Sequence, residues 1–441
     1  MHGSTTTRRV FLRQVGVLAG AVAGGGLLAA CQPTAPSAAP SATAAPVAAG
    51  GGEAVFKLGV VTSLSGEDVF GGNVTRRGYD FWAETINKQG GVDVGGQRYK
   101  VQLVYADDQS KPATGADAAE RMINQEKVDV ILGPYTSGVT LAVAPITEKY
   151  KVPMLAGSAE SPNVWKANPK YTFGIIPSVD LTAGKSLGVL VQQAEPKSES
   201  VAVIGVNEPF SKEAAEGFLK SAQDLKLNIV KQEFVPSNAD LTPIVSSVAA
   251  AKPDIVAVGG HEEILINFVK AAKSLNFVPK AIIMHYGVTV PDFAKNLGKD
   301  AEAIFGLAVW TPDVSFKDEL FGTAKDYAEA ARNRWGSEPD YTEAACSASG
   351  LVFQAAVAKV GKKPPLAAGD REALNAAIEQ VTIQTFYGPI KFTTEGEHFH
   401  DNTEPVPVLV QVQNGGIVSV GPANAKRANM VYPLPAWNTR S

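Results

Sequence analysis

Short apolar runs alternate with segments of helical periodicity through most of the chain, from about residue 55 onwards. The runs are rich in valine and isoleucine, and they are continuous rather than interrupted by polar residues at every second position. This pattern is typical of strands that are buried on both faces of a sheet. Eight runs show it: FKLGVVTSL, YKVQLVYADD, VDVILGP, VPMLAGS, SVAVIGV, PDIVAVGG, KAIIMHY and IFGLAVW.

Helical segments lie between these runs. In NVTRRGYDFWAETINKQ, apolar residues recur at helical spacing from Val74 to Ile86. Asn73 is the predicted N-cap of this helix, and Gly90 and Gly91 are its predicted stop. Strands and helices that alternate in this way predict right-handed βαβ units and a mostly parallel sheet, which is an α/β fold.

The first thirty residues have a different pattern. A basic head with Arg8 and Arg9 precedes an uncharged, glycine-rich apolar run at about 15–30. The run is short for a membrane-spanning helix and fits a secretory signal. The paired arginines resemble a twin-arginine export signal, and Leu28-Ala29-Ala30-Cys31 resembles a bacterial lipobox.

The lipobox resemblance implies cleavage before Cys31 and a lipid on its sulfur. The stretch that follows, up to residue 54, is nearly all Pro, Ala, Ser, Thr, Val and Gly, so we expect a flexible tether. The protein is then expected outside the cytoplasm, in the periplasm or at the cell surface, and held to the membrane by its lipid anchor only.

Composition narrows the choice of partners. The body is longer than one typical domain, so two are expected. Loss of the leader removes three arginines and no acid, so the net charge of −4 becomes −7. No basic tract occurs in the body, and nucleic acid is not an expected partner. Cys346, the remaining cysteine, lies in an alanine-rich helical stretch and is predicted to be a small buried residue.

Ligands of such sheets bind beyond the carboxyl ends of the strands, so the loops that leave the strands are the places to search. These loops are small, polar and partly aromatic; they include GPYTSG, GSAESPN, VNEPFSK, GGHEE and HYGVT. None ends in the GK[ST] of a phosphate loop, and residues 66–72 lack the Rossmann glycine spacing. No nucleotide or other cofactor is therefore expected.

Several pieces, in this order and spacing, resemble the periplasmic solute-binding proteins of branched-chain amino acid ABC transporters: INKQGGV, DDQSKP, ILGPYTS, APITEKYKVP and YGPIKF. The resemblance covers essentially the whole body. It implies a type I periplasmic-binding fold, with two doubly wound α/β lobes, three hinge crossovers and a ligand cleft between the lobes. We place the crossovers near Val179, Val309 and Tyr387.

The expected division of the chain follows from these crossovers. It comprises a signal peptide at 1–30, a tether at 31–54, lobe one at 55–179 and 309–386, lobe two at 180–308 and 387–425, and a surface tail at 426–441.

The resemblance also implies a set of ligand-binding positions. In the family, hydroxyl and backbone N–H groups of one lobe hold the α-carboxylate of the ligand. The matching positions are Phe70, Tyr135, Ser137, Ser158, Glu160 and Ser161 in lobe one, and Asp180, Phe210, His261 and Tyr286 in lobe two.

Three of these positions depart from the family pattern. Glu160 stands where a hydroxyl usually meets the carboxylate, Tyr286 stands where an acid usually pairs with the ammonium, and His261 replaces a frequent tyrosine. If Glu160 points into the cleft, the ligand is expected to carry a cation or hydrogen-bond donors, as an amine, an amide or a urea-like group does. If an offset in the loop 156–162 turns Glu160 outward, Ser161 takes the hydroxyl role. An amino acid or an aromatic acid then remains open as the ligand.

The resemblance implies binding and delivery to an ABC permease, not catalysis. The expected function is capture of an amino acid, an amide or a related small molecule for import. An extracytoplasmic sensor that acts through a signalling partner would have the same fold and stays open as an alternative. A secreted hydrolase is disfavoured because no GxSxG or similar motif accompanies the few histidines.

One short segment brings together metal-binding residue types. GEHFHDN, at 396–402, places His398, His400 and Asp401 close together. Because a histidine pair needs further ligands in a set geometry, we expect a surface hairpin here and no metal site.

Overall fold

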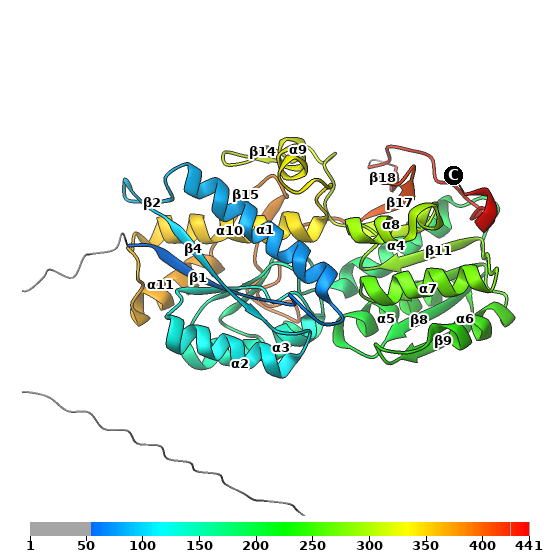
Figure 1. Cartoon of the computed structure of the whole chain (residues 1–441), viewed down its shortest axis with the longest axis horizontal. Coiled ribbons are helices and arrows are strands. Elements are labelled where there is room, and N and C mark those ends of the chain that lie inside the picture. Colours follow the sequence, from blue (N-terminus) through cyan, green and yellow to red (C-terminus); the bar gives the residue numbers. More distant parts are fainter. Residues whose placement is uncertain (1–53, 424, 441) are drawn as a thin grey trace, which may run out of the picture. The chain divides into compact units, whose positions relative to one another are not determined.

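Two separate β-sheets form the framework of residues 54–423 and 425–440, the part of the chain that the computed structural model describes (Figure 1). Both sheets belong to one compact unit. The predicted signal peptide, Cys31 and the tether up to residue 53 lie outside the described residues.

The first sheet has five parallel strands in the order β4-β1-β5-β6-β7. They are β1 (Phe56–Thr62), β4 (Val101–Asp107), β5 (Val130–Leu132), β6 (Met154–Ala156) and β7 (Thr172–Gly174). Successive side chains of β1 enter different cores, since Val60 belongs to one hydrophobic cluster and Val61 to another. A strand with a core on each face reads as a continuous apolar run, which explains the sequence pattern.

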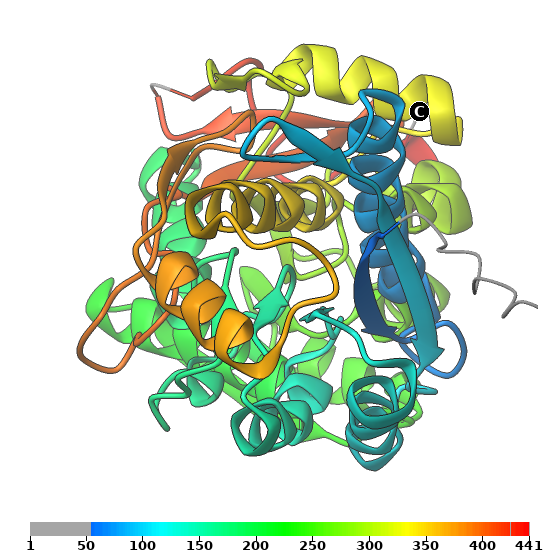
Figure 2. The same ribbon diagram turned by 90° about the vertical axis from the view of Figure 1, so that its left-hand side faces the viewer.

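Helices cover both faces of this sheet. The helices α1 (Val69–Lys88) and α10 (Tyr341–Val360) pack together on one face, where α11 (Ala368–Glu379) joins them. On the other face lie α2 (Pro112–Arg121), which continues into the π-helical turn Met122–Glu126, and α3 (Ser137–Tyr150). Figure 2 shows α10 between α1 and α11, with α2 and α3 in the lower part of the view.

The second sheet has seven strands in the order β18-β17-β12-β11-β10-β8-β9. They are β8 (Ser200–Val206), β9 (Asn228–Val235), β10 (Ile255–Gly259), β11 (Ala281–His285), β12 (Phe305–Ala308), β17 (Val408–Gln413) and β18 (Gly416–Gly421). The pairs from β9 to β12 are parallel, whereas β12–β17 and β17–β18 are antiparallel. A mixed edge on a parallel sheet is common in doubly wound folds.

Its two faces are also covered. The helices α4 (Val179–Gln193) and α5 (Pro209–Asp224) contribute to the hydrophobic cluster on one face. The cluster on the other face contains α6 (Leu241–Ala250), α7 (Glu262–Ser274) and α8 (Pro291–Leu297). With helices on both faces of two mainly parallel sheets, the described residues have the predicted doubly wound α/β architecture.

Small elements complete the fold. They are the hairpin strands β2 (Val92–Val94) with β3 (Gln97–Tyr99), β13 (Lys317–Asp318) with β14 (Gly322–Thr323) and β15 (Thr382–Gln384) with β16 (Pro389–Lys391), the helix α9 (Ala324–Trp335), and 3-10 turns at Pro162–Val164, Gly298–Ala301 and Trp437–Thr439.

The chain passes between the two halves of the fold in three places. These lie between β7 and α4, between β12 and β13, and between β16 and β17. The first and third passages touch, because Gly174 N–H donates to the His400 carbonyl and Asn402 N–H donates to the Gly174 carbonyl. The exact lobe limits that we placed at Val179, Val309 and Tyr387 stay a prediction.

Most of the predicted elements are present. All eight apolar runs contain strands, and Cys346 is fully buried on α10. The prediction for Asn73 was wrong, since α1 begins at Val69 and the Asn73 amide donates to the Val69 carbonyl from inside the helix. No helix among the described residues is both long and apolar enough to cross a membrane.

The last described residues of the chain are packed against the second half of the fold. Leu434 and Trp437 are buried in the core formed by α6, α7 and α8, and the Trp437 indole N–H donates to the Phe277 carbonyl at 3.0 Å.

Close packing of α1 against α10 yields a test of the fold. A β-carbon at Gly350 would overlap the indole ring of Trp82, which is fully buried. Gly350→Ala is expected to lower the free energy of unfolding by about 1–3 kcal/mol, the usual cost of overpacking. Urea unfolding followed by circular dichroism measures the change.

Gly188→Ala is the matched control. Gly188 lies within α4 and a β-carbon there meets no atom within 4 Å. That substitution is expected to raise stability by about 0.5–1 kcal/mol, because alanine favours the helix over glycine. Equal effects of the two substitutions would contradict the described packing of α1 on α10.

Candidate functional site

Hydrogen bonds of two serine hydroxyl groups connect the segments that follow β5 and β6 in the first sheet. The loop between β5 and α3 carries Tyr135, Ser137 is the first residue of α3, and the loop after β6 carries Ser158, Glu160 and Ser161. Ser137 Oγ accepts hydrogen bonds from the backbone N–H groups of Glu160 and Ser161, both at 3.1 Å. The Ser158 hydroxyl donates to the carbonyls of the β5 loop at 3.0 and 3.1 Å. Both hydroxyl groups therefore fix one loop against the other.

Glu160 is buried and points toward the second sheet. Its Oε2 lies 3.2 Å from His285 Nε2, and its Oε1 accepts a hydrogen bond from the Tyr341 hydroxyl at 3.0 Å. Of the two orientations that the sequence left open, the structure has the inward one. Ser161, by contrast, caps the short helix Pro162–Val164, with its Oγ accepting from Asn163 N–H at 3.3 Å.

A second link between the sheets passes through Tyr135. Its hydroxyl donates to Glu262 Oε1 at 2.8 Å and lies 3.0 Å from His261 Nδ1. Since the tyrosine proton is used by Glu262, Nδ1 of His261 is the donor of the other bond. Burial raises the pKa of Glu262 to about 7, against the opposing effects of His261 and of the Tyr135 hydroxyl.

Tyr286 is paired within the protein. Its hydroxyl donates to Asp340 Oδ2 at 2.5 Å, and Asp340 Oδ1 accepts from Glu343 N–H at the start of α10. Burial raises the pKa of Asp340, although the Tyr286 hydrogen bond lowers it in part. The rings of Tyr135, Tyr286 and Tyr341 form a chain, with centroids 6.4 and 5.2 Å apart. One aromatic and carboxylate network thus connects His261 to Asp340.

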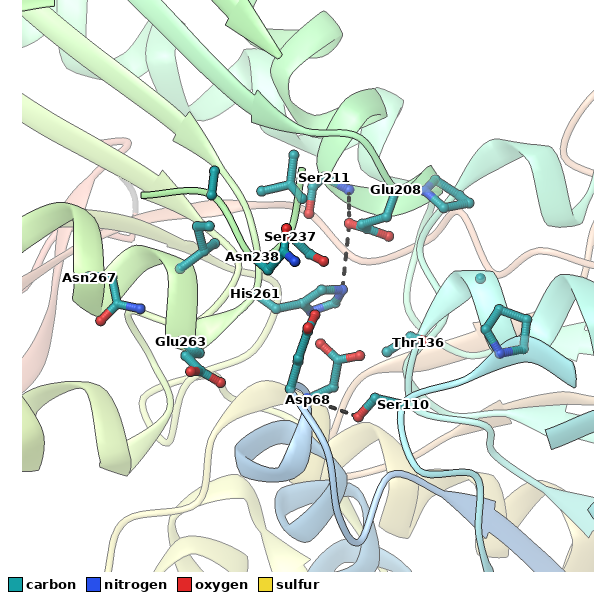
Figure 3. A pocket seen from close by; sticks show the side chains of 17 residues that line it. Asp68, Ser110, Thr136, Glu208, Ser211, Ser237, Asn238, His261, Glu263 and Asn267 are labelled. Atoms are coloured by element: carbon teal, nitrogen blue, oxygen red, sulfur yellow. Dashed lines mark hydrogen bonds and ion pairs between the residues drawn. The ribbon is translucent and has the colours of Figure 1, made fainter. Parts of the chain in front are cut away.

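A cavity of about 410 Å³ opens beside this network. Its wall comes from loops of both sheets and consists of Glu67, Asp68, Ser110, Pro112, Thr136, Gly138, Val206, Glu208, Pro209, Ser211, Ser237, Asn238, Ala239, His261, Glu263, Ile264 and Asn267. Figure 3 shows Asp68, Glu208 and Glu263 around the imidazole of His261.

His261 is the link between the cavity and the network. Its Nε2 lies 3.6 Å from Glu208 Oε1, and its ring lies 5.0 Å from that of Phe210. Burial lowers the pKa of His261, but Asp68, Glu208 and other nearby carboxylates raise it, and the net shift is upward. The imidazole therefore favours its protonated form next to Glu208.

The structure brings eight of the ten predicted binding positions into one connected region and leaves two apart. The eight are Tyr135, Ser137, Ser158, Glu160, Ser161, Phe210, His261 and Tyr286. Phe70 is half-buried and packs against the core of α6, α7 and α8. Asp180 has 38% of its side chain exposed and lies 3.5 Å from His398 Nε2. Whether any of the ten contacts a ligand stays a prediction.

The prediction from sequence missed the partners of these residues: Glu262, His285, Asp340 and Tyr341. Asp340 did leave a local signal, since an acid three residues before Glu343 marks a helix start. His285 lies at the end of a predicted strand, but nothing local indicates that it meets Glu160. That contact joins residues far apart in sequence.

The histidines of segment 396–402 take part in local contacts. His398 Nδ1 lies 3.5 Å from Asp401 Oδ2, and His400 is buried against the ring of Phe173. Among the described residues, no group of three His, Cys, Asp or Glu side chains is placed to hold a metal ion.

Several solved structures share this fold. A leucine-binding protein from Thermotoga maritima aligns with a TM-score of 0.71 at 22% identity, over 83% of this chain and 97% of that protein. A branched-chain amino acid transporter substrate-binding protein from Streptococcus pneumoniae, solved with isoleucine, aligns with a TM-score of 0.71 at 21% identity, over 86% and 100%. A solute-binding protein of an ABC transporter from R. palustris, solved with benzoate, aligns with a TM-score of 0.70 at 20% identity, over 87% and 97%.

Sequence comparison gives the family. The model of the family described as periplasmic binding protein matches residues 55–416, so the chain belongs to that family. Among curated proteins, a Leu/Ile/Val-binding protein homolog of Brucella abortus (strain 2308) is 24% identical over 392 residues, which cover 85% of this chain and 93% of that protein. The predicted fold class and the resemblance stated from sequence are confirmed.

The buried carboxyl group of Glu262 predicts a pH effect on stability. Its pKa is about 7 in the folded protein and near 4.5 when exposed, so its protonated form stabilises the fold below about pH 4.5. That contribution is lost as the pH rises from about 4.5 to 7. Glu262→Gln is therefore expected to gain stability relative to the unsubstituted protein between pH 5 and pH 8, by up to about 3 kcal/mol.

Urea unfolding of both proteins at several pH values measures this difference. Glu329→Gln, on an exposed position of α9, is the control and should show no such trend. A constant difference between Glu262→Gln and the unsubstituted protein across this range would rule out the raised pKa.

Proposed function

We propose that this protein is the extracytoplasmic solute-binding component of an ABC importer, which captures a small molecule and delivers it to a permease. The observation that carries the proposal is the convergence of strand-end loops from both sheets on one region next to a cavity. This is the place where open α/β sheets bind ligands. Membership of the periplasmic binding protein family supports the same function.

Hinge motion between the two halves is the proposed mechanism. The contacts Glu160–His285 and Tyr135–Glu262 join loops of the first sheet to the end of β11 and to the start of α7 in the second half. A ligand that binds loops of both sheets shifts the population toward the closed form by as much as it prefers that form. No covalent step is required, and the proposed role is binding without catalysis.

The proposed ligands are an amino acid, an amide, a urea-like compound or an aromatic acid. Similar proteins were solved with isoleucine and with benzoate. Glu160 does not narrow this choice, because both of its carboxylate oxygens already have partners in His285 and Tyr341 and it is not among the residues that line the cavity.

The lipid anchor is also part of the proposal. It rests on the sequence around Cys31, which the structure does not describe. An acylated protein held near the membrane would raise the effective concentration of the loaded form at the permease.

A thermal-shift scan of the full-length protein tests the binding function. The library should contain aliphatic amino acids, aromatic acids, amides, ureas and amines. A ligand at about one hundred times its Kd stabilises the folded state by about 2.7 kcal/mol, which raises Tm by a few degrees. A protein that is folded but shows no shift with any class would contradict the proposed function.

Substitution of Cys31 tests the anchor. In cells that process lipoproteins, Cys31→Ala is expected to abolish labelling with radioactive palmitate and to move the protein from the membrane fraction to the soluble fraction. Cys346→Ala is the matched control, because Cys346 is fully buried in α10. An unchanged label in Cys31→Ala would refute the lipid at this position.

A further inference from the structure

Four carboxylates line the cavity beside His261: Glu67, Asp68, Glu208 and Glu263. No lysine or arginine is among the described residues of its wall, and His261 is the one basic side chain there. Since His261 already lies next to Glu208, it offers little attraction to a second anion. The charge of the wall therefore favours cations.

At two of the helix starts around this cavity, side chains already accept from backbone N–H groups that could bind an anion. The ends of helices bind carboxylates through free N–H groups, and α5 and α3 begin at this cavity. Glu208 accepts from Phe210 N–H at 3.1 Å and from Ser211 N–H at 2.5 Å. Thr136 Oγ1 likewise accepts from Val139 N–H at the start of α3, at 3.2 Å. A ligand carboxylate at the start of α3 or α5 would have to displace these contacts.

Helix dipoles do not remove the excess of negative charge. The helices α1, α2, α3, α5 and α7 all begin at or next to the cavity. Each positive end is equivalent to about half a charge, so together they offset about 2.5 of the four carboxylate charges, and a protonated His261 offsets about one more. Capping thus explains why acids occur here, and it leaves the wall with a small excess of negative charge.

Ser211 gives an independent indication of a ligand. Its side chain is fully buried in the wall of the cavity, and its hydroxyl has no hydrogen-bond partner among the described residues. A buried hydroxyl without a partner is unfavourable unless another group satisfies it. Apolar residues such as Val206 and Ile264 complete the wall and suit a short hydrocarbon stem. The volume, about 410 Å³, lies in the range of small-molecule sites.

We infer that this cavity binds a small cationic solute, an amine or an amidine without a free carboxylate. The inference rests on the proposed function and narrows its ligand class. The cation would lie between Asp68 and Glu263, and its N–H groups would donate to these carboxylates and to Ser211 Oγ. Burial raises the pKa of Asp68, and Glu208, Glu67 and Glu263 raise it further against the effect of His261. A bound cation would relieve that repulsion.

Isothermal titration of the full-length protein tests the inference. The probes are 1,4-diaminobutane and agmatine as cations, and leucine and benzoate as carboxylates. We expect saturable binding of at least one cationic probe and none of benzoate. Asp68→Asn should weaken the cation by about tenfold or more, as loss of a charged partner does.

Matched variants keep this test interpretable. Asp224→Asn is the control, because Asp224 lies at the far end of α5 with 69% of its side chain exposed and should leave binding unchanged. Glu263→Gln is a second variant, on an exposed position of α7, and serves if Asp68→Asn does not fold.

The outcomes separate the two proposals. Binding of leucine or benzoate, with no binding of either cationic probe, would overturn the inference and leave the proposed function standing. Cation binding that neither Asp68→Asn nor Glu263→Gln weakens would overturn the placement in this cavity. Failure of every probe here, together with no thermal shift across the wider library, would count against both proposals.

Discussion

Glu160 is the residue on which the arrangement of the site depends. A carboxylate that is removed from water is costly unless it is paired and hydrogen-bonded. Each carboxylate oxygen of Glu160 has a partner, His285 from the second sheet at one and Tyr341 from α10 at the other. Its backbone is fixed by Ser137, so the side chain has a defined direction. The contact therefore couples a loop of the first sheet, a strand end of the second sheet and the start of α10.

Much of the fold could be predicted from sequence because the signal is local. Strands with a core on each face appear as uninterrupted apolar runs, and all eight runs contain strands. The strand β9 was not predicted. It lies at the edge of the sheet, most of its residues are only partly buried, and the polar residues Lys231, Gln232 and Glu233 interrupt its apolar run. The helix start predicted at Asn73 was wrong because an asparagine side chain, which often caps a helix, can also form a hydrogen bond from inside the helix.

The site was predictable in outline but not in its pairings. Strand-end loops and the helix starts that follow them bring eight of the ten predicted positions into one region, as the topology requires. The partners of those positions come from the starts of α7 and α10 and from the end of β11. Such pairs depend on how the two sheets are placed relative to each other, and the spacing of residues along the sequence does not give that placement. The position of Asp180 could not be predicted for the same reason. It is exposed and lies beside His398, which is more than two hundred residues away in the sequence.

The order of elements along the chain also bears on how the protein folds. The first sheet ends at β7, yet α10, which covers it, begins at Tyr341; the second sheet gains its last strands, β17 and β18, only at residues 408–421. Contacts between residues so far apart slow folding, because a long loop must close before the contact forms. Almost the whole chain must therefore leave the ribosome before either half has all of its strands and covering helices. Until then, apolar faces of both sheets stay open to aggregation, so the cell needs to protect the nascent protein along most of its length.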